Sequence, residues 1–284
     1  MLEVIQRSTE FLAKKGVESP RLQTELLLAH WLRLPRMQLY LNFERSLTAE
    51  ELGGFRELIQ RRGKREPLQH VVGSTSFCGL EIAVNRHVLI PRPETELLAE
   101  RGWSFLKDRS ATNGKTPAAL DFGTGSGCLA IALAHECPAA QVCAVDISAE
   151  ALALARQNAA RHGVSERIRF LHGDSLGAAP EGARFDLIIS NPPYVPSGEI
   201  DRLEPEVRDH DPRLALNGGA DGLDYFRRLA AEALPKLEAG GKLMLEFGDG
   251  QGEAVREIFR AQKWVVEALV EDYNQRQRIL IAHG

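Results

Sequence analysis

The sequence predicts an α/β protein: a doubly wound, mostly parallel, seven-stranded sheet preceded by a small N-terminal helical domain and a β-hairpin linker. Three observations lead to this prediction. Apolar residues recur at helical spacing through residues 1–70, whereas from residue 117 onward short apolar runs alternate with helical segments. Between these regions lies a β-rich stretch interrupted by glycines. Regular strand–helix alternation is typical of a parallel sheet covered by helices on both faces.

Residues 1–70 are expected to form the helical domain. Pro20 and Pro35 fall where two of its helices would begin, and Thr48 and Glu51 have the spacing of a capping box that opens the last one. A basic run follows at the end of that helix. We interpret this run as a solvated helix end, with a docking patch for a partner macromolecule as the alternative. Its members are Arg61, Arg62, Lys64 and Arg65.

Residues 71–92 are expected to form the β-hairpin linker, and residues 93–284 the larger α/β domain. A helix should begin at Pro93. Further helices are expected at 127–136, 149–162, 222–236 and 251–261. Strands are expected at 118–122, 141–146, 167–174, 185–190, 242–248, 264–271 and 276–284. The long irregular stretch after the fourth of these strands, about 191–220, is the kind of loop that usually carries function.

The composition excludes several classes of protein. A net charge of −4 and a pI near 6.1 argue against binding nucleic acid through a broadly basic surface, so we expect no stable nucleic-acid binding. No apolar run approaches the roughly 18 residues of a membrane span, and the N-terminus lacks the apolar core of a signal peptide. Four cysteines and eight histidines show no metal-ligand spacing. We therefore expect a cytoplasmic protein with no membrane association and no metal.

A glycine-rich loop follows the first strand of the larger domain. In DFGTGSGCLA, residues 121–130, the glycines at 123, 125 and 127 let the backbone turn tightly before a helix and approach a ligand closely. Asp146 ends the second strand 19 residues after Gly127 (146 − 127), where its carboxylate can accept both hydroxyls of a ribose. Asp174 ends the third strand beside Ser175, where an adenine amino group could donate to it. These positions predict a nucleotide site.

The spacing of the glycines favours one cofactor over another. The dinucleotide fingerprint is G-x-G-x-x-G with a pyrophosphate at the helix N-terminus, whereas this loop has G-x-G-x-G and no basic residue. We therefore favour S-adenosylmethionine over NAD, because its methionine carboxylate and ribose need fewer anion contacts.

The fourth strand, FDLIIS, leads directly into NPPY at residues 191–194. The side-chain oxygen of Asn191 and the carbonyl of Pro192 offer two acceptors, which suit the two N–H bonds of a planar NH₂ group. Tyr194 can stack on the flat group that carries it. The prolines, Pro193 included, restrict this backbone and so preorganise it. Such a site suits methyl transfer to an amide or arylamine nitrogen, whose delocalised lone pair makes orientation decisive.

The chain resembles the family that methylates a glutamine in peptide chain release factors, often called the HemK family. The resemblance rests on REPLQHVVG (65–73), LIPRPETE (89–96), DFGTGSGCLAIALA (121–134), NPPYV (191–195) and EVRDHDPRLALNGGADGLDYFRRL (206–229). It covers nearly the whole chain. NPPY alone is shared with adenine-N6 methyltransferases, whereas LIPRPETE together with NPPY is far more specific.

The resemblance implies a catalytic methyltransferase domain of Rossmann-like fold and particular site residues. Its implied activity is transfer of a methyl group from S-adenosylmethionine to the glutamine N5 of a Gly-Gly-Gln motif in class 1 release factors, which the helical domain helps to grip. The implied cofactor contacts are Gly123, Thr124, Gly125, Ser126, Gly127, Asp146, Asp174, Ser175 and Asn191. The implied substrate site is Asn191, Pro192, Pro193 and Tyr194, with Asn191, Pro192 and Tyr194 in the catalytic roles.

Alternatives stay open at this point. The same NPPY chemistry would serve an adenine-N6 methyltransferase acting on DNA or RNA, in which the base is flipped out of the duplex. A third possibility is a module that binds S-adenosylmethionine or a partner but catalyses no reaction. Arg92 either contacts the carboxylate of the cofactor or fastens the linker to the larger domain. Glu246, at the end of the fifth strand, is expected to be a surface charge rather than a residue that reaches the site.

Overall fold

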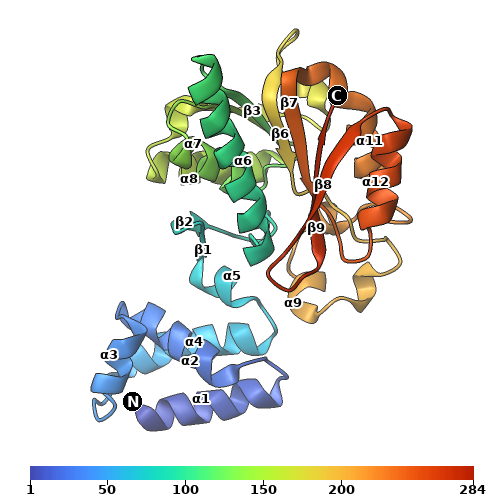
Figure 1. Cartoon of the computed structure of the whole chain (residues 1–284). Coiled ribbons are helices and arrows are strands. Elements are labelled where there is room, and N and C mark those ends of the chain that lie inside the picture. The colour runs from blue at the N-terminus through green and yellow to red at the C-terminus, as the bar shows by residue number, and fades with distance from the viewer. The chain divides into compact units, whose positions relative to one another are not determined.

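A computed structural model describes residues 1–284, with the side chain of Asn113 excepted, and it confirms the predicted α/β class (Figure 1). The chain forms two compact units. Unit 1 consists of Met1–Ser74 together with Glu204–His210, and unit 2 consists of Thr75–Leu203 together with Asp211–Gly284. The second segment of unit 1 comes from the long irregular stretch after NPPY, and the sequence had not indicated this.

Unit 1 is helical, as predicted. Its helices are α1 (Leu2–Lys14), α2 (Pro20–Leu32), α3 (Arg36–Leu41), α4 (Ala49–Gly63), α5 (Leu68–Val72) and α9 (Pro205–Arg208). The predicted capping box is confirmed: the Glu51 backbone N–H donates to Thr48 Oγ1 at 3.2 Å, and the Thr48 N–H donates to Glu51 Oε2 at 2.9 Å. The helical apolar stripes meet in one core whose fully buried members include Ile5, Leu12, Leu27, Leu28 and Leu39.

The expected solvated helix end is wrong for part of the basic run. Arg62 is buried, with 3% of the residue exposed, and its guanidinium donates to Glu206 Oε1 at 2.6 Å. Arg65 also donates to Glu206, at 2.7 Å from Nε and 2.6 Å from Nη2. The prediction failed because the carboxylate that binds these arginines, that of Glu206, lies more than 100 residues away in sequence. The pattern around residues 61–65 does not reveal it.

Unit 2 contains the linker hairpin and the main sheet. The hairpin strands are β1 (Ser74–Phe77), which begins at the last residue of the first segment of unit 1, and β2 (Leu80–Ala83). The strands of the main sheet are β3 (Ala118–Phe122), β4 (Gln141–Asp146), β5 (Ile168–His172), β6 (Phe185–Ser190), β7 (Leu237–Glu246), β8 (Val265–Glu271) and β9 (Gln277–His283). Their order is β5-β4-β3-β6-β7-β9-β8. The pairs from β5 to β7 are parallel, and β9 runs antiparallel to both of its neighbours.

Helices cover both faces of this sheet. The α-helices of unit 2 are α6 (Pro93–Asn113), α7 (Cys128–Glu136), α8 (Ala149–Arg161), α10 (Arg213–Leu216), α11 (Asp224–Glu232) and α12 (Gly252–Ala261). Its short 3₁₀ helices are η1 (Ser165–Arg167), η2 (Leu176–Ala178), η3 (Ile200–Arg202) and η4 (Leu234–Lys236). None of the helices over the described residues has both the length and the apolar character that a membrane crossing requires.

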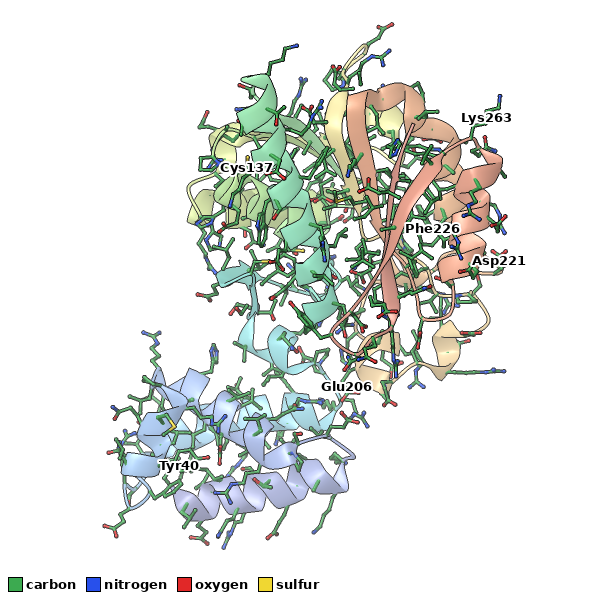
Figure 2. The ribbon with its side chains drawn as sticks, viewed as in Figure 1. Tyr40, Cys137, Glu206, Asp221, Phe226 and Lys263 are labelled. Atoms are coloured by element: carbon green, nitrogen blue, oxygen red, sulfur yellow. The ribbon has the colours of Figure 1, made fainter. Side chains whose placement is uncertain are left out.

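Alternating strand residues serve two separate cores. Leu187 and Ile189 of β6 pack in the core that contains α6, α7 and α8, whereas Ile188 packs in the core that contains α11 and α12. Figure 1 shows the first group of helices on one side of the sheet and the second group on the other. Phe226 of α11, labelled in Figure 2, is fully buried in the second core. This two-sided burial is the doubly wound arrangement that the sequence predicts.

The strand order places the reversal of the winding beside β3. From β3 the chain moves outward to β4 and β5, and then crosses to β6 on the other side of β3. Doubly wound sheets bind ligands at the carboxyl ends of the strands at such a reversal. In this chain the residues that follow β3 and β6 are the glycine loop and NPPY, so the topology brings the two motifs to one edge.

Candidate active site

A cleft of about 240 Å³ lies at this edge within unit 2. It is lined by residues of the glycine loop, of the ends of β4 and β5, and of NPPY. The predicted site residues that line it are Gly123, Thr124, Gly125, Ser126, Asp146, Asp174, Asn191, Pro192 and Pro193. Three of the predicted residues do not line it, namely Gly127, Ser175 and Tyr194. The cleft also includes Arg86 and His87 after the linker hairpin, which sequence reasoning had not singled out.

Backbone hydrogen bonds to the neighbouring strand β4 hold the glycine loop in place. The N–H groups of Gly123 and Thr124 both donate to the Val145 carbonyl, at 2.9 and 3.0 Å. Gly127 then precedes α7 with φ of 83°, a conformation that residues with a Cβ rarely adopt. A Cβ at Gly127 would also lie 3.0 Å from the Ala155 Cβ. Gly127 therefore shapes the turn and lets α7 and α8 approach closely, although it does not face the cleft.

Asp121 holds the glycine loop through buried hydrogen bonds, a role that was not predicted from the sequence. The residue is fully buried, and its Oδ2 accepts hydrogen bonds from Thr124 Oγ1 at 2.6 Å and from the Ala130 N–H at 3.2 Å. Burial raises the pKa of this carboxyl to about 7, against the lowering effect of those two bonds. The sequence feature that could have indicated this role is an acidic residue inside an otherwise apolar strand, directly before the glycines.

Asp146 links the end of β4 to the glycine loop. Its Oδ2 accepts from the Gly125 N–H at 2.8 Å, and its Oδ1 accepts from the Ser148 N–H at 2.9 Å. Each carboxylate oxygen has two lone pairs, so each keeps capacity for a further donor. The carboxylate thus fixes the loop and still presents acceptors to the cleft that it lines.

The third predicted acidic position is arranged differently. Asp174 lines the cleft, but its side chain is 68% exposed and lies 3.7 Å from the guanidinium of Arg228. Ser175 is partly buried, immediately precedes the short helix η2 and does not line the cleft. Of this pair, only Asp174 is placed where it could contact a ligand in the cleft.

The NPPY segment is held by residues near the end of the irregular stretch, which run back beside it. The Val195 N–H donates to the Leu216 carbonyl and the Gly218 N–H donates to the Val195 carbonyl, both at 2.9 Å. Gly218 passes so close that a Cβ there would lie 2.8 Å from the Pro193 carbonyl oxygen. The stiffness of the two prolines is thus reinforced by a second strand-like segment beside them.

Tyr194 packs away from the cleft. Its ring contributes to the core that contains α11 and α12, and its carbonyl accepts from Gln251 Nε2 at 2.9 Å. Burial raises the pKa of its phenol to about 12, and the nearby Glu246 adds to this. The stacking role assigned to Tyr194 from the sequence therefore stays a prediction.

Thr95, which also lines the cleft, and Glu246, which does not, form a hydrogen-bonded chain with Asn191. The Asn191 side-chain nitrogen donates to Thr95 Oγ1 at 3.1 Å, and Thr95 Oγ1 donates to Glu246 Oε2 at 2.7 Å. Glu246 is only 2% exposed, so the expected surface charge is wrong. The reason is that β7 ends inside unit 2, under the first turn of α6, and not at the surface.

Arg92 has a partner in the irregular stretch. Its Nη2 donates to Asp211 Oδ2 at 2.7 Å, and the Asp211 side chain is 1% exposed. Burial raises the pKa of Asp211 to about 6, against the lowering effect of the Arg92 charge. Arg92 does not line the cleft. Of its two sequence readings, the structure favours the one in which it fastens the segment before α6.

Two family models match separate parts of this chain. The PrmC N-terminal domain matches residues 3–73, and the methyltransferase small domain matches residues 101–203. The second match includes the glycine loop, Asp146 and NPPY. A methyltransferase from Pyrococcus furiosus has the same fold, with a TM-score of 0.53 at 21% identity over 78% of this chain and 97% of that one. The fold and the cleft therefore define a protein of the methyltransferase class.

Curated relatives narrow the assignment. A release factor glutamine methyltransferase of Geobacter sulfurreducens is 47% identical over 90% of this chain and 87% of its own length. One of Chlorobaculum tepidum is 44% identical over 98% of this chain and 95% of its own length. The chain belongs to the family of release factor glutamine methyltransferases, and the resemblance read from its motifs is confirmed.

Proposed function

We propose that the protein transfers a methyl group from S-adenosylmethionine to the side-chain N5 of the glutamine in the Gly-Gly-Gln motif of class 1 peptide chain release factors. One observation carries the proposal: Asn191 and Pro192 line the same cleft as the glycine loop and Asp146. Family membership supports the choice of glutamine over adenine as the group that NPPY receives.

The residues present fit S-adenosylmethionine. Both oxygens of Asp146 keep a free lone pair at the cleft, which suits the two hydroxyls of a ribose. The glycine loop precedes α7, and the N–H groups and dipole of a helix N-terminus favour a carboxylate such as that of the methionine moiety. When bound, this cofactor supplies an electrophilic methyl group on its sulfonium.

The protein contributes orientation more than acid–base chemistry. An amide nitrogen is a poor nucleophile because its lone pair is delocalised into the carbonyl. The Asn191 side-chain oxygen and the Pro192 carbonyl would each accept one of the two N–H bonds of the glutamine, which fixes the direction of its lone pair. Holding these acceptors in place before the substrate arrives avoids reorganisation during the reaction. Tyr194 is proposed as the aromatic surface beside the glutamine, a role that requires its ring to turn from the core that contains α11 and α12 toward the cleft.

A transfer assay tests the proposal. The protein is incubated with S-adenosylmethionine labelled in the methyl group and a purified class 1 release factor, and the labelled residue is located by peptide mass spectrometry. We expect label on the glutamine of Gly-Gly-Gln, and a release factor in which this residue is asparagine serves as the control. Label on DNA or RNA supplied in the same assay, with none on the release factor, would overturn the proposal in favour of adenine-N6 methylation.

A further inference from the structure

Glu246 and Thr95 are buried polar side chains that extend the hydrogen-bonded chain from Asn191, and Thr95 is also among the residues that line the cleft. Glu246 is the last residue of β7, and Thr95 lies in the first turn of α6, 151 residues earlier in the chain. Each is 2% exposed. Burying a carboxylate is unfavourable unless it is well hydrogen-bonded, so its presence behind the cleft calls for an explanation.

The donor and acceptor properties of the chain fix its direction. An ionised carboxylate only accepts hydrogen bonds, so whenever Glu246 is ionised the Thr95 hydroxyl must donate to it, and the two atoms lie 2.7 Å apart. The oxygen of Thr95 is then left as an acceptor, and the group that faces it at 3.1 Å must be the NH₂ end of the Asn191 amide. The Asn191 oxygen is consequently directed to the other side of the amide, and Asn191 lines the cleft.

We propose that Thr95 and Glu246 are positioning residues that set the orientation of the Asn191 amide, so that its oxygen and not its NH₂ group faces the substrate. This inference rests on the proposed function, since it concerns the acceptor that NPPY presents to an NH₂ group. The two ends of an asparagine amide have nearly the same shape, so packing alone distinguishes them poorly. A reversed amide would place its own N–H bonds against those of the substrate.

The ionised form of Glu246 is what gives the chain its direction. A protonated Glu246 could itself donate to Thr95 Oγ1, and the Thr95 hydroxyl would no longer have to point at the carboxyl group. The charged or titratable groups whose fields reach Glu246 are Glu94 beside Thr95 on α6, Arg278 on β9 and Tyr194 after β6. Burial is the largest influence and raises the pKa of Glu246 to about 7, and the Glu94 charge adds to this. The hydrogen bond from Thr95, the Arg278 charge and the contact with Asn191 act in the opposite direction and favour the ionised form.

Four variants separate positioning from simple packing. Thr95→Val removes the hydroxyl and keeps the shape, and Thr95→Ser restores the hydroxyl. Glu246→Gln keeps the shape but offers both a donor and an acceptor, so the direction of the chain is lost. Thr24→Val is the matched control, because the hydroxyl of Thr24 is also fully buried and has no hydrogen-bond partner among the described residues.

The first measurement is steady-state methyl transfer to the release factor together with the Kd for S-adenosylmethionine. We expect Thr95→Val and Glu246→Gln to lower kcat about 10- to 100-fold while the Kd of the cofactor changes less than about threefold. Thr95→Ser should recover most of the kcat that Thr95→Val loses, and Thr24→Val should leave kcat unchanged. Equal losses in Thr95→Val and Thr95→Ser, or an unchanged kcat in Thr95→Val, would overturn the inference.

The second measurement does not depend on activity. The side-chain NH₂ protons of Asn191, assigned by their loss in Asn191→Asp, should exchange slowly with solvent in the unmodified protein and faster in Thr95→Val. Fast exchange in the unmodified protein would contradict the inference even if transfer to the glutamine is observed. Slow exchange together with no transfer to any release factor would instead contradict the proposed function and leave the orienting chain in place.

Discussion

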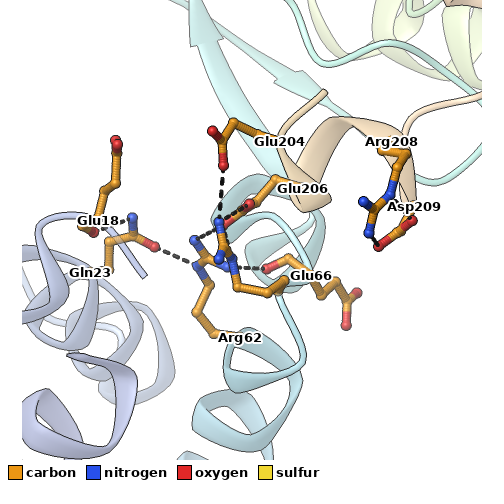
Figure 3. A network of polar contacts seen from close by, with 9 residues as sticks. Glu18, Gln23, Arg62, Glu66, Glu204, Glu206, Arg208 and Asp209 are labelled. Carbon is orange, nitrogen blue, oxygen red and sulfur yellow. Dashed lines mark hydrogen bonds and ion pairs between the residues drawn. The ribbon is translucent and has the colours of Figure 1, made fainter. Parts of the chain in front are cut away.

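Glu206 and Arg62 form a 2.6 Å ion pair across 144 residues of sequence, and both belong to unit 1. The Arg62 side chain is 4% exposed and that of Glu206 is 20% exposed. Arg62 also donates to Gln23 Oε1 at 2.6 Å and to the Glu66 carbonyl at 3.2 Å, so its guanidinium is held from several sides (Figure 3). A seven-residue piece of the stretch that follows NPPY is thereby part of the helical unit.

This pair predicts an acid-sensitive contribution to stability. Burial acts to raise the pKa of Glu206, but the hydrogen bonds from Arg65 and Arg62 outweigh it and lower the pKa to about 2. The stabilisation is therefore present above about pH 4.5, the ordinary carboxyl value, and is lost as the pH falls toward 2. Glu206→Gln should lower the free energy of unfolding by on the order of 2 kcal/mol at pH 7.

Urea unfolding of the unmodified protein and Glu206→Gln at several pH values checks this. The difference between them should shrink as the pH is lowered below 4. Glu204→Gln is the control, because its carboxylate is 79% exposed and contacts Arg65 only at 3.4 Å. A difference that is the same at pH 3 and pH 7 would show that the charge of Glu206 is not the cause.

Asn191→Ala should affect the rate of transfer more than cofactor binding. The substitution removes one of the two acceptors for the substrate NH₂ group, and we expect kcat to fall about 10²- to 10³-fold. The Kd for S-adenosylmethionine should rise by less than about tenfold. Single-turnover transfer and calorimetric titration of the cofactor measure the two effects. The control is Asn274→Ala, an exposed asparagine before β9.

Asp146→Ala should affect cofactor binding more than the rate of transfer. The carboxylate holds the Gly125 N–H and faces the cleft, so its loss should weaken S-adenosylmethionine binding by about 10- to 100-fold. At saturating cofactor most of kcat should return. Asp108→Ala, which removes an exposed carboxylate on α6, is the control. If Asp146→Ala and Asn191→Ala both changed only the affinity for the cofactor, the proposed roles of the two residues would be wrong.

Asp121→Asn should change how stability depends on pH. Because burial raises the folded-state pKa of Asp121 to about 7, its contribution is fully present below about pH 3.8 and is lost as the pH rises through 7. The asparagine does not titrate, and its side-chain oxygen can still accept from Thr124. Relative to the unmodified protein, the variant should therefore gain up to about 2–4 kcal/mol of stability between pH 5 and pH 8.

Thermal unfolding at pH 5, 6, 7 and 8 measures this gain. Because Glu246 and Asp211 also have raised pKa values, the quantity that matters is the difference between the variant and the unmodified protein at each pH. Asp108→Asn should show no such trend. A constant difference across this range would mean that Asp121 is already ionised in the folded protein.

The sequence predicted the sheet of unit 2 well because its signals are local. The apolar runs of β3, β4 and β6 begin and end where the structure has them, since turn residues bound each run. The glycine loop and Asp146 could be placed beside NPPY, because parallel strands bring their carboxyl ends to one edge. The residues of the cleft were therefore predictable wherever they directly follow a strand.

Three features escaped prediction, two of them because their partners lie far away in sequence. Nothing around Glu246 indicates that Thr95 covers it, and nothing around Arg62 indicates Glu206. Asp121 directly precedes the glycine loop, but its burial depends on how α7 packs against β3. In each case a charged residue looks exposed when it is read by itself, and only the tertiary contact shows that it is buried.

The two-segment composition of unit 1 has a consequence for how the chain can be divided. A fragment that ends at Ser74 would keep the deeply placed guanidinium of Arg62 but lose the carboxylate that neutralises it. A fragment that starts at Thr75 would in turn carry Glu204 and Glu206 without their arginines. The helical region is therefore not a detachable module, and no single cut in the sequence separates it from the rest of the chain with its ion pairs intact.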